Sequence, residues 1–226
     1  MPQIAENLAA IRERVRAAAV QSGRSPDAVK LLAVSKTFPP EAVAEAYAAG
    51  QGRFGENRVQ ELAAKAPALP KAIEWHQIGH LQANKVRGAL EFASWIHAVD
   101  SLSLLRRIER LAAEMAVHPK LLLEVNVSGE ESKFGLRPQD VSALLRELPQ
   151  DAPAPGVGLM TMAPLDAPQE LLHAVFGGLR RLRDQVQQEA GRALPELSMG
   201  MSGDFEVAIQ EGSTIVRVGS AIFGHR

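Results

Sequence analysis

Short apolar runs of strand length recur along the chain, and segments with helical periodicity separate most of them. The first segment places Ile4, Leu8, Ile11 and Val15 three or four residues apart, which is the spacing of one helix face. Eight strand candidates follow it, over residues 31–35, 53–55, 74–78, 95–99, 120–127, 157–161, 196–199 and 214–218. The pattern predicts alternating strands and helices behind an extra N-terminal helix.

Several strand candidates contain continuous apolar runs, as in LLAV of the first, and KLLLEVNV of the fifth is the clearest strand. Strands of this kind are covered on both faces, as in a parallel sheet. Their alternation with helices indicates an α/β fold, and their number favours closure into a (β/α)8 TIM-type barrel over an open doubly wound sheet. The proline-rich segment 152–156 resembles a linker, but a loop before the sixth strand explains it equally well. We therefore expect a single domain over residues 1–226.

The composition argues against several classes of function. The 25 basic and 26 acidic residues give a net charge of −1, so the chain carries no basic footprint for nucleic acid. The absence of cysteine excludes disulfides and thiolate catalysis, and it suits a reducing compartment. Charged residues interrupt the N-terminal segment where a signal peptide needs an apolar run, and no stretch is long and apolar enough to span a membrane. We expect a cytoplasmic protein that binds neither nucleic acid nor membranes.

Lys36 directly follows the first strand candidate, at the carboxyl end where barrels collect their ligand chemistry. The apolar strand beside it would partly desolvate its amine, which lowers the pKa of a lysine and prepares it for Schiff-base formation. A lysine whose ammonium group simply reaches solvent at the barrel mouth is the simpler interpretation. The residue alone does not decide between the two.

Two turns that contain glycine and serine follow the last two strand candidates. LSMGMSGD, residues 197–204, leads into a predicted helix, and VRVGSAIFG, residues 216–224, repeats the arrangement. Backbone N–H groups and serine hydroxyls at such turns can bind phosphate, and barrels often bind phosphate after strands seven and eight. Ser202, Gly219 and Ser220 are the candidates, although a glycine–serine turn is most often only a turn.

Arg217 lies within the last strand candidate, and a permanently charged arginine that points inward needs an acceptor. That acceptor could be a barrel carboxylate such as Glu124, or the pyridine nitrogen of a bound cofactor. Asn57, after the second strand candidate, could orient a substituent of a cofactor ring or simply cap a helix.

Other patterns fail on their spacing. GMSGD is not a nucleophile elbow, because Asp204 stands where that motif needs glycine. His76 and His80 are four residues apart, but Gly79 and the strand-like context argue against the single helix face that a metal-binding pair requires. The histidine spacing gives no reason to expect a metal site. No dinucleotide fingerprint or P-loop is present, so we expect no nucleotide site either.

Seven segments, taken in order, resemble the pyridoxal phosphate homeostasis protein family. They are LLAVSKTFPP, FGENRVQE, WHQIGHLQANK, EVNVSGEESKFGL, GLMTMAP, LSMGMSGD and VRVGSAIFG, and the resemblance extends from about residue 4 to the C-terminus. Members of this family look like the barrel half of the fold-type III pyridoxal phosphate enzymes, alanine racemase among them. The resemblance implies an alanine-racemase-like barrel that binds pyridoxal 5′-phosphate (PLP).

The resemblance also implies which residues bind the cofactor. They are Lys36, Asn57, Met199, Ser202, Arg217, Gly219 and Ser220. Lys36 would hold PLP as an internal aldimine, and Arg217 would face its pyridine nitrogen. The two serines and the glycine would hold the phosphate, while Asn57 and Met199 would lie around the ring. Ser220 and Arg58 stand where the family usually has threonine and an aromatic residue; both hydroxyls bind phosphate, whereas Arg58 leaves that edge of the pocket undefined.

The implied contacts favour a carrier over a fast enzyme. A guanidinium group only donates hydrogen bonds, so Arg217 would keep the pyridine nitrogen unprotonated and the cofactor a weak electron sink. Two-base racemisation needs groups on opposite faces of the substrate. Lys36 would serve one face, but fold-type III racemases use a partner subunit's tyrosine for the other, and the single tyrosine here, Tyr47, lies in an early predicted helix.

We therefore expect no catalytic residues. The protein would bind PLP reversibly and deliver or buffer it for recipient PLP-dependent enzymes, as a monomer. A slow amino-acid racemase that uses a histidine or water as its second base is one alternative. The other is an aldolase-type barrel enzyme in which Lys36 forms a Schiff base with the substrate.

Overall fold

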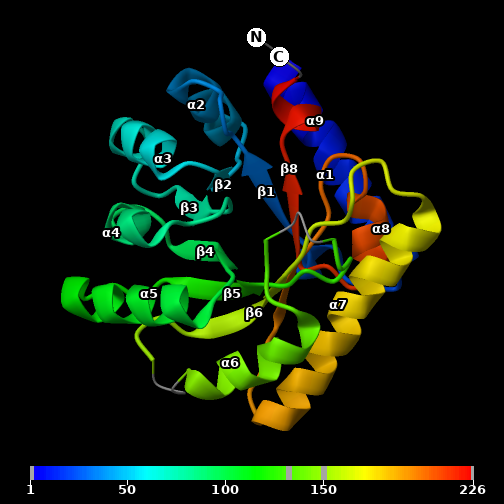
Figure 1. Ribbon diagram of the computed structural model, residues 1–226. Helices are drawn as coiled ribbons and strands as arrows, with labels where there is room; N and C mark the ends of the chain where they lie inside the picture. Colours follow the sequence, from blue (N-terminus) through cyan, green and yellow to red (C-terminus); the bar gives the residue numbers. More distant parts are fainter. Residues whose placement is uncertain (1–2, 131–133, 149–151, 225–226) are drawn as a thin grey trace.

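Strands β1 to β8 form a closed parallel barrel in the computed structural model, which describes residues 3–130, 134–148 and 152–224 (Figure 1). Each strand pairs with the next in sequence, and β8 pairs with β1 to close the sheet. The strands are β1 (Lys30–Val34), β2 (Arg53–Glu56), β3 (Glu74–Gln77), β4 (Trp95–Val99), β5 (Lys120–Glu124), β6 (Gly156–Met160), β7 (Glu196–Ser198) and β8 (Ile215–Val218). The predicted (β/α)8 barrel is confirmed.

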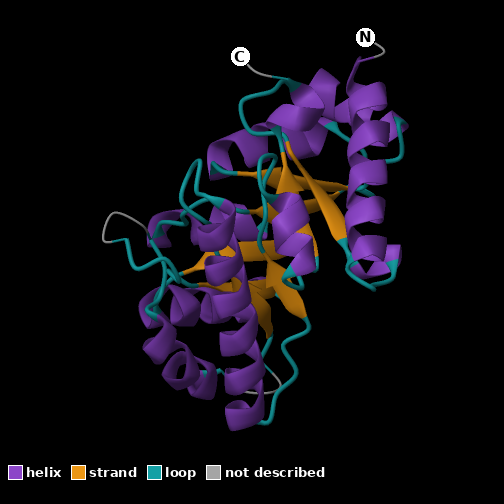
Figure 2. Cartoon of the chain, turned by 90° about the vertical axis from the view of Figure 1, so that its right-hand side faces the viewer, coloured by secondary structure: helices purple, strands orange, loops and turns teal. Residues whose placement is uncertain are grey.

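Helices cover the outside of the barrel (Figure 2). They are α1 (Gln3–Gln21), α2 (Pro40–Ala48), α3 (Val59–Lys65), α4 (Val86–Leu90), α5 (Leu102–Met115), α6 (Val141–Glu147), α7 (Gln169–Ala190), α8 (Phe205–Gln210) and α9 (Ser220–Phe223). The predicted extra N-terminal helix is α1, which packs against α2, α8 and α9. Among the helices described, none combines the length and the apolar character needed to cross a membrane.

The strand boundaries follow the predicted ones to within a few residues, with the largest difference at β5. The apolar pattern predicts a strand to Val127, but β5 ends at Glu124 and Val125 forms an isolated bridge with Leu136. Gly135 makes this return of the chain possible, because its φ of 118° suits glycine and a Cβ there would lie 2.8 Å from the Asn126 nitrogen. The backbone of Leu136 thus takes the hydrogen bonds that a continuing strand would use.

Apolar side chains fill both the barrel and the layer between strands and helices. The cluster inside the barrel contains Leu32, Trp95, Ala98, Leu122, Met160 and Ile215. On the outside, α5 buries Leu104 and Ile108 against the strands, and the hydroxyl of Ser101 caps this helix by accepting the Leu104 N–H at 3.3 Å. The packed layers fix the ends of the strands in space.

Candidate functional site

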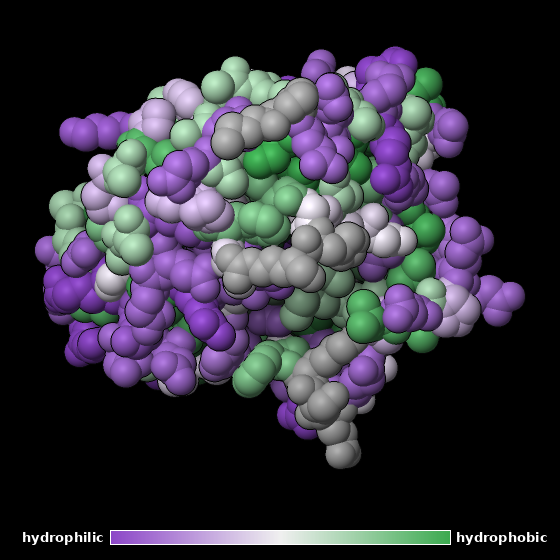
Figure 3. Space-filling view, turned by 90° about the horizontal axis from the view of Figure 1, so that it is seen from above, coloured by the Kyte–Doolittle hydropathy of each residue, from purple (hydrophilic) through white to green (hydrophobic). Residues whose placement is uncertain are grey.

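A cavity of about 860 Å³ opens at the carboxyl ends of the strands. Strands β1 and β8 end toward the top of Figure 1, and the view from above in Figure 3 shows apolar side chains between hydrophilic ones on that face. Six of the seven residues predicted for the site line the cavity: Lys36, Asn57, Ser202, Arg217, Gly219 and Ser220. The fold therefore brings together residues from both ends of the chain.

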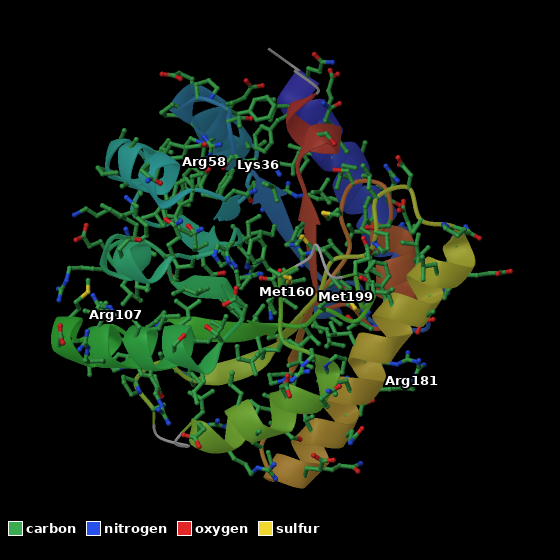
Figure 4. All side chains as sticks on the ribbon, viewed as in Figure 1. Lys36, Arg58, Arg107, Met160, Arg181 and Met199 are labelled. Atoms are coloured by element: carbon green, nitrogen blue, oxygen red, sulfur yellow. The ribbon has the colours of Figure 1, made fainter. Side chains whose placement is uncertain are left out.

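Lys36 follows β1 directly, at the mouth of the barrel (Figure 4). Its side chain is exposed, so the partial desolvation expected from the neighbouring strand is not observed. The backbone on either side of it is anchored by acidic side chains. Ser35 donates its hydroxyl to Glu56 Oε1 at 2.6 Å, and Thr37, whose φ is 69°, donates its N–H to Glu61 Oε2 at 2.7 Å. The lysine thus stands on a fixed stretch of chain.

Lys65 of α3 joins these two anchors beneath the Lys36 segment. It is 5% exposed, and its Nζ donates to the Ser35 carbonyl at 2.8 Å and to Glu56 Oε1 at 2.7 Å. The same Nζ lies 3.7 Å from Glu61 Oε2. Burial raises the pKa of Glu56, and the hydrogen bonds from Lys65 and Ser35 partly offset this rise.

Arg217 lies on β8, beside β1, with Leu32 as its partner in the register. The residue is 4% exposed; its guanidinium donates to Ser198 Oγ at 2.6 Å and to the Thr161 carbonyl at 2.9 Å. Among the described residues its hydrogen-bond partners are therefore Ser198 and Thr161, and not Glu124, the partner that the sequence suggested. Burial lowers the pKa of Arg217 to about 10, so the group stays charged at neutral pH.

The loops after β7 and β8 meet at the two serine turns. The backbone N–H of Gly219 donates to Ser202 Oγ at 3.3 Å, which joins the predicted phosphate-binding residues directly. Gly219 also packs closely against β1, since a Cβ there would lie 3.1 Å from the Val34 carbonyl oxygen. Ser220, the next residue, opens α9 and lines the same cavity.

The two residues expected around a cofactor ring are placed differently. Asn57 lines the cavity, and its backbone carbonyl accepts a hydrogen bond from the Gln77 side chain at 2.9 Å. Met199 is fully buried in the core between barrel and helices and is not among the lining residues. Figure 4 shows it apart from Lys36. The structure therefore gives Met199 a packing position in the core and does not place it at the cavity wall.

Comparison with known proteins shows the family to which this chain belongs. The sequence model described as "Alanine racemase, N-terminal domain" matches residues 6–226. The pyridoxal phosphate homeostasis protein of Aquifex aeolicus is 44% identical to this chain, over 98% of it and 97% of the relative. The protein of the same name from Escherichia coli K12 is 38% identical, over 100% of this chain and 98% of the relative. The chain belongs to the pyridoxal phosphate homeostasis protein family.

Solved structures agree with this membership and with the fold. PipY of Synechococcus elongatus PCC7942, solved without PLP, is 43% identical, covers 98% of this chain and 100% of its own, and superposes with a TM-score of 0.89. A second PipY structure, with PLP bound, gives a TM-score of 0.87. Alanine racemase of Clostridium difficile 630 gives 0.77 at 15% identity, over 57% of its own chain, a likeness of fold alone. The family resemblance carried by the seven segments is confirmed.

Two residues that line the cavity, His80 and Phe134, were not recognised as site residues from the sequence. His80, considered there only as a metal ligand, stacks on Phe134 with ring centroids 4.1 Å apart and pairs with Asp100 at 3.0 Å. Phe134 is 58% exposed. Their common signal is position, since each belongs to a segment that follows a strand at the carboxyl end of the barrel.

Glu124 lines the cavity from the end of β5 and is almost fully buried. Burial raises its pKa from 4.5 to about 7; the charge of Asp100 adds to the rise, and that of Arg217 opposes it. The sequence suggested this residue only as an ion-pair partner. A carboxyl group in this position changes its charge near neutral pH.

The Glu124→Gln variant is expected to gain stability relative to the wild type as pH rises from about 4.5 to about 7. In this range the unfolded wild-type chain releases the Glu124 proton while the folded chain keeps it, so the wild type loses stability. Below this range the carboxyl group is neutral in both states. Across the range the difference in free energy of unfolding between variant and wild type changes by about 3 kcal/mol, and above it the difference is constant. Urea unfolding of both cofactor-free proteins across this range measures the difference, and a difference independent of pH would contradict the raised pKa.

Proposed function

We propose that this protein binds PLP reversibly through Lys36 and carries or buffers the cofactor inside the cell. The observation that carries the proposal is the convergence of Lys36, Arg217 and the two serine turns on one cavity. It is supported by relatives named for pyridoxal phosphate homeostasis and by a 43% identical protein, PipY, whose structure has PLP bound. The proposed unit is one domain over residues 1–226.

The residues around the cavity fit the chemistry of this cofactor. PLP offers an aldehyde, a pyridine nitrogen and a phosphate; when bound, it supplies an electron sink. Lys36 provides an amine for the aldehyde, and Arg217 provides a donor for the nitrogen. Ser202 and Ser220 provide hydroxyls for the phosphate, beside the N–H of Gly219. The volume of about 860 Å³ lies within the usual range for small-molecule sites.

The same arrangement favours a carrier over a fast enzyme. Arg217 can only donate hydrogen bonds, so it would leave the pyridine nitrogen unprotonated and the electron sink weak. Tyr47, the single tyrosine, packs against the outer core from α2 and is not among the residues that line the cavity. His80 and Glu124 do line the cavity, and they keep a slow racemase as the second candidate function.

The proposed contact residues are the six that line the cavity, and Met199 packs in the core. The proposed partners are PLP itself and the PLP-dependent enzymes that receive it. A cytoplasmic location and a monomeric state complete the proposal, and the absence of cysteine suits the first. Light scattering of the purified chain tests the second.

Cofactor retention and proton exchange test the proposed function together. A carrier is expected to retain PLP through purification, or to take it up on incubation, and to exchange the α-proton of added alanine at rates well below about 1 s⁻¹. Exchange at about that rate or faster would contradict the carrier and support the racemase. Failure to bind PLP at all would contradict both and leave the aldolase-type enzyme, in which Lys36 reacts with the substrate itself.

A further inference from the structure

The interior of the barrel contains polar side chains where branched apolar ones are the rule. His76 of β3, His97 of β4 and Ser198 of β7 are each at most 1% exposed, although the surrounding cluster is apolar. Trp95 stacks on the His76 ring, with centroids 5.2 Å apart and planes 8° from parallel. Buried polar groups are costly unless each has a hydrogen-bond partner, so their presence here calls for a reason.

These side chains form a continuous chain of contacts from the cavity to the opposite end of the barrel. Arg217 Nη1 lies 2.6 Å from Ser198 Oγ, and that oxygen lies 3.0 Å from His97 Nδ1. His97 Nε2 lies 2.8 Å from His76 Nδ1, and His76 Nε2 lies 3.1 Å from Glu74 Oε1. Glu74 begins β3 and is partly exposed at the amino-terminal end of the strands.

The hydrogen bonds between these side chains can run in one direction only, from Arg217 to Glu74. Arg217 must donate to Ser198, because guanidinium has no acceptor. The Ser198 hydroxyl hydrogen then finds its acceptor, among the described residues, at His97 Nδ1. A neutral imidazole carries one N–H, so His97 donates from Nε2 to His76 Nδ1. His76 in turn donates from Nε2 to the Glu74 carboxylate, which only accepts.

This direction requires both histidines to be neutral, and their surroundings agree. Burial lowers the pKa of His76, although the neighbouring Glu74 carboxylate opposes the shift. Burial lowers the pKa of His97 well below its ordinary value, and the nearby charge of Arg217 adds to the effect. The hydrogen bond from His76 holds the pKa of Glu74 at about 2, so this end of the chain stays an acceptor.

We propose that Ser198, His97 and His76 are positioning residues that aim the Arg217 guanidinium from inside the barrel. They fix Ser198 Oγ as the acceptor for Nη1, while the Thr161 carbonyl fixes Nη2. The guanidinium plane is thereby set before any ligand enters the cavity. The inference rests on the proposed function for the identity of what Arg217 meets, namely the ring nitrogen of PLP.

The tautomers of the two histidines test the direction of these hydrogen bonds in the unmodified protein. Nitrogen-15 NMR of histidine-labelled wild-type protein without PLP is expected to show His76 and His97 as neutral Nε2–H tautomers at neutral pH. Signals are assigned by comparison with His76→Gln and His97→Asn. An Nδ1–H tautomer or a charged ring at either position would overturn the inference, whatever the protein does with PLP.

A matched pair of variants at His97 tests the effect on the cofactor. His97→Asn keeps an oxygen acceptor close to the Nδ1 position, whereas His97→Leu offers none. We expect PLP to bind His97→Leu about tenfold more weakly than the wild type, and His97→Asn to stay within about threefold. Equal affinity of the folded leucine variant and the wild type, or an equal loss in both variants, would overturn the inference. If the wild type fails to bind PLP, the proposed function fails, and the tautomer measurement still decides the direction of the chain.

Discussion

The Lys36→Ala variant is expected to hold no PLP covalently and to bind it roughly a hundredfold or more weakly than the wild type, a loss of about 3 kcal/mol. The variant loses the amine at the cavity but keeps Arg217 and the serine turns, so weak non-covalent binding should remain. Because Lys36 is exposed, its removal should leave the fold intact. Equilibrium dialysis against PLP gives the affinity, and borohydride treatment before denaturation gives the covalent fraction.

Lys71→Ala is the matched control for this experiment. Lys71 is exposed and precedes β3, at the end of the barrel opposite the cavity, so its removal should change neither measurement. Wild-type affinity in Lys36→Ala would contradict the anchoring role of Lys36. An equal loss in both lysine variants would show that the chemistry depends on surface amines in general.

The Lys65→Met variant is expected to lower the free energy of unfolding by about 3–5 kcal/mol. Lys65 is the partner of Glu56, whose side chain is fully buried, and methionine would leave that carboxylate with a neighbouring serine hydroxyl but no positive charge. A buried charge without its counter-ion is among the costliest single defects in a protein. Urea unfolding at neutral pH measures the loss, with Lys71→Met as the exposed-lysine control.

A double variant separates the buried pair from other effects of the lysine. Lys65→Met combined with Glu56→Gln removes both charges, so it should regain a large part of the stability lost in Lys65→Met. If the loss of unfolding free energy in the double variant equalled the sum of the losses in the two single variants, Lys65 and Glu56 would not act as a pair. The single variant should also bind PLP more weakly, because Lys65 holds the carbonyl of Ser35, next to Lys36.

The barrel could be predicted from sequence because several strands covered on both faces contain continuous apolar runs, separated by helical patterns. WIHAV marks β4 residue for residue, and LLAV lies within β1. The end of β5 could not be predicted in this way. Val125 to Val127 are as apolar as the strand before them, but the chain returns at Gly135 and Leu136 takes over the hydrogen bonds. Such a return depends on contacts distant in sequence.

The location of the site could be predicted from the barrel, because the residues that directly follow its parallel strands all lie at one end of it. Six residues proposed on that basis and on the family resemblance do line one cavity. Their partners were harder to foresee. The sequence suggested Glu124 as the acceptor for Arg217, but the guanidinium donates to Ser198 and Thr161. Which of several nearby acceptors an inward arginine meets depends on packing that periodicity does not encode.

The polar side chains inside the barrel could have been recognised in the sequence of the strands. EWHQI and WIHAV each place a histidine within an otherwise buried strand. A polar side chain at such a position must find a partner inside the barrel. The pairing of the two histidines with each other, at 2.8 Å, depends on the register between β3 and β4 and was visible only in the structure.

Borohydride reduction of the PLP-loaded wild-type protein, followed by trypsin digestion and mass spectrometry, shows whether Lys36 binds the cofactor covalently. Reduction would fix the cofactor on its lysine, and trypsin would no longer cleave after Lys36. We expect one pyridoxyl-bearing peptide over residues 31–53, in place of the separate peptides 31–36 and 37–53. Normal cleavage after Lys36, with no adduct on either peptide after incubation with excess PLP, would contradict the proposal that Lys36 anchors the cofactor.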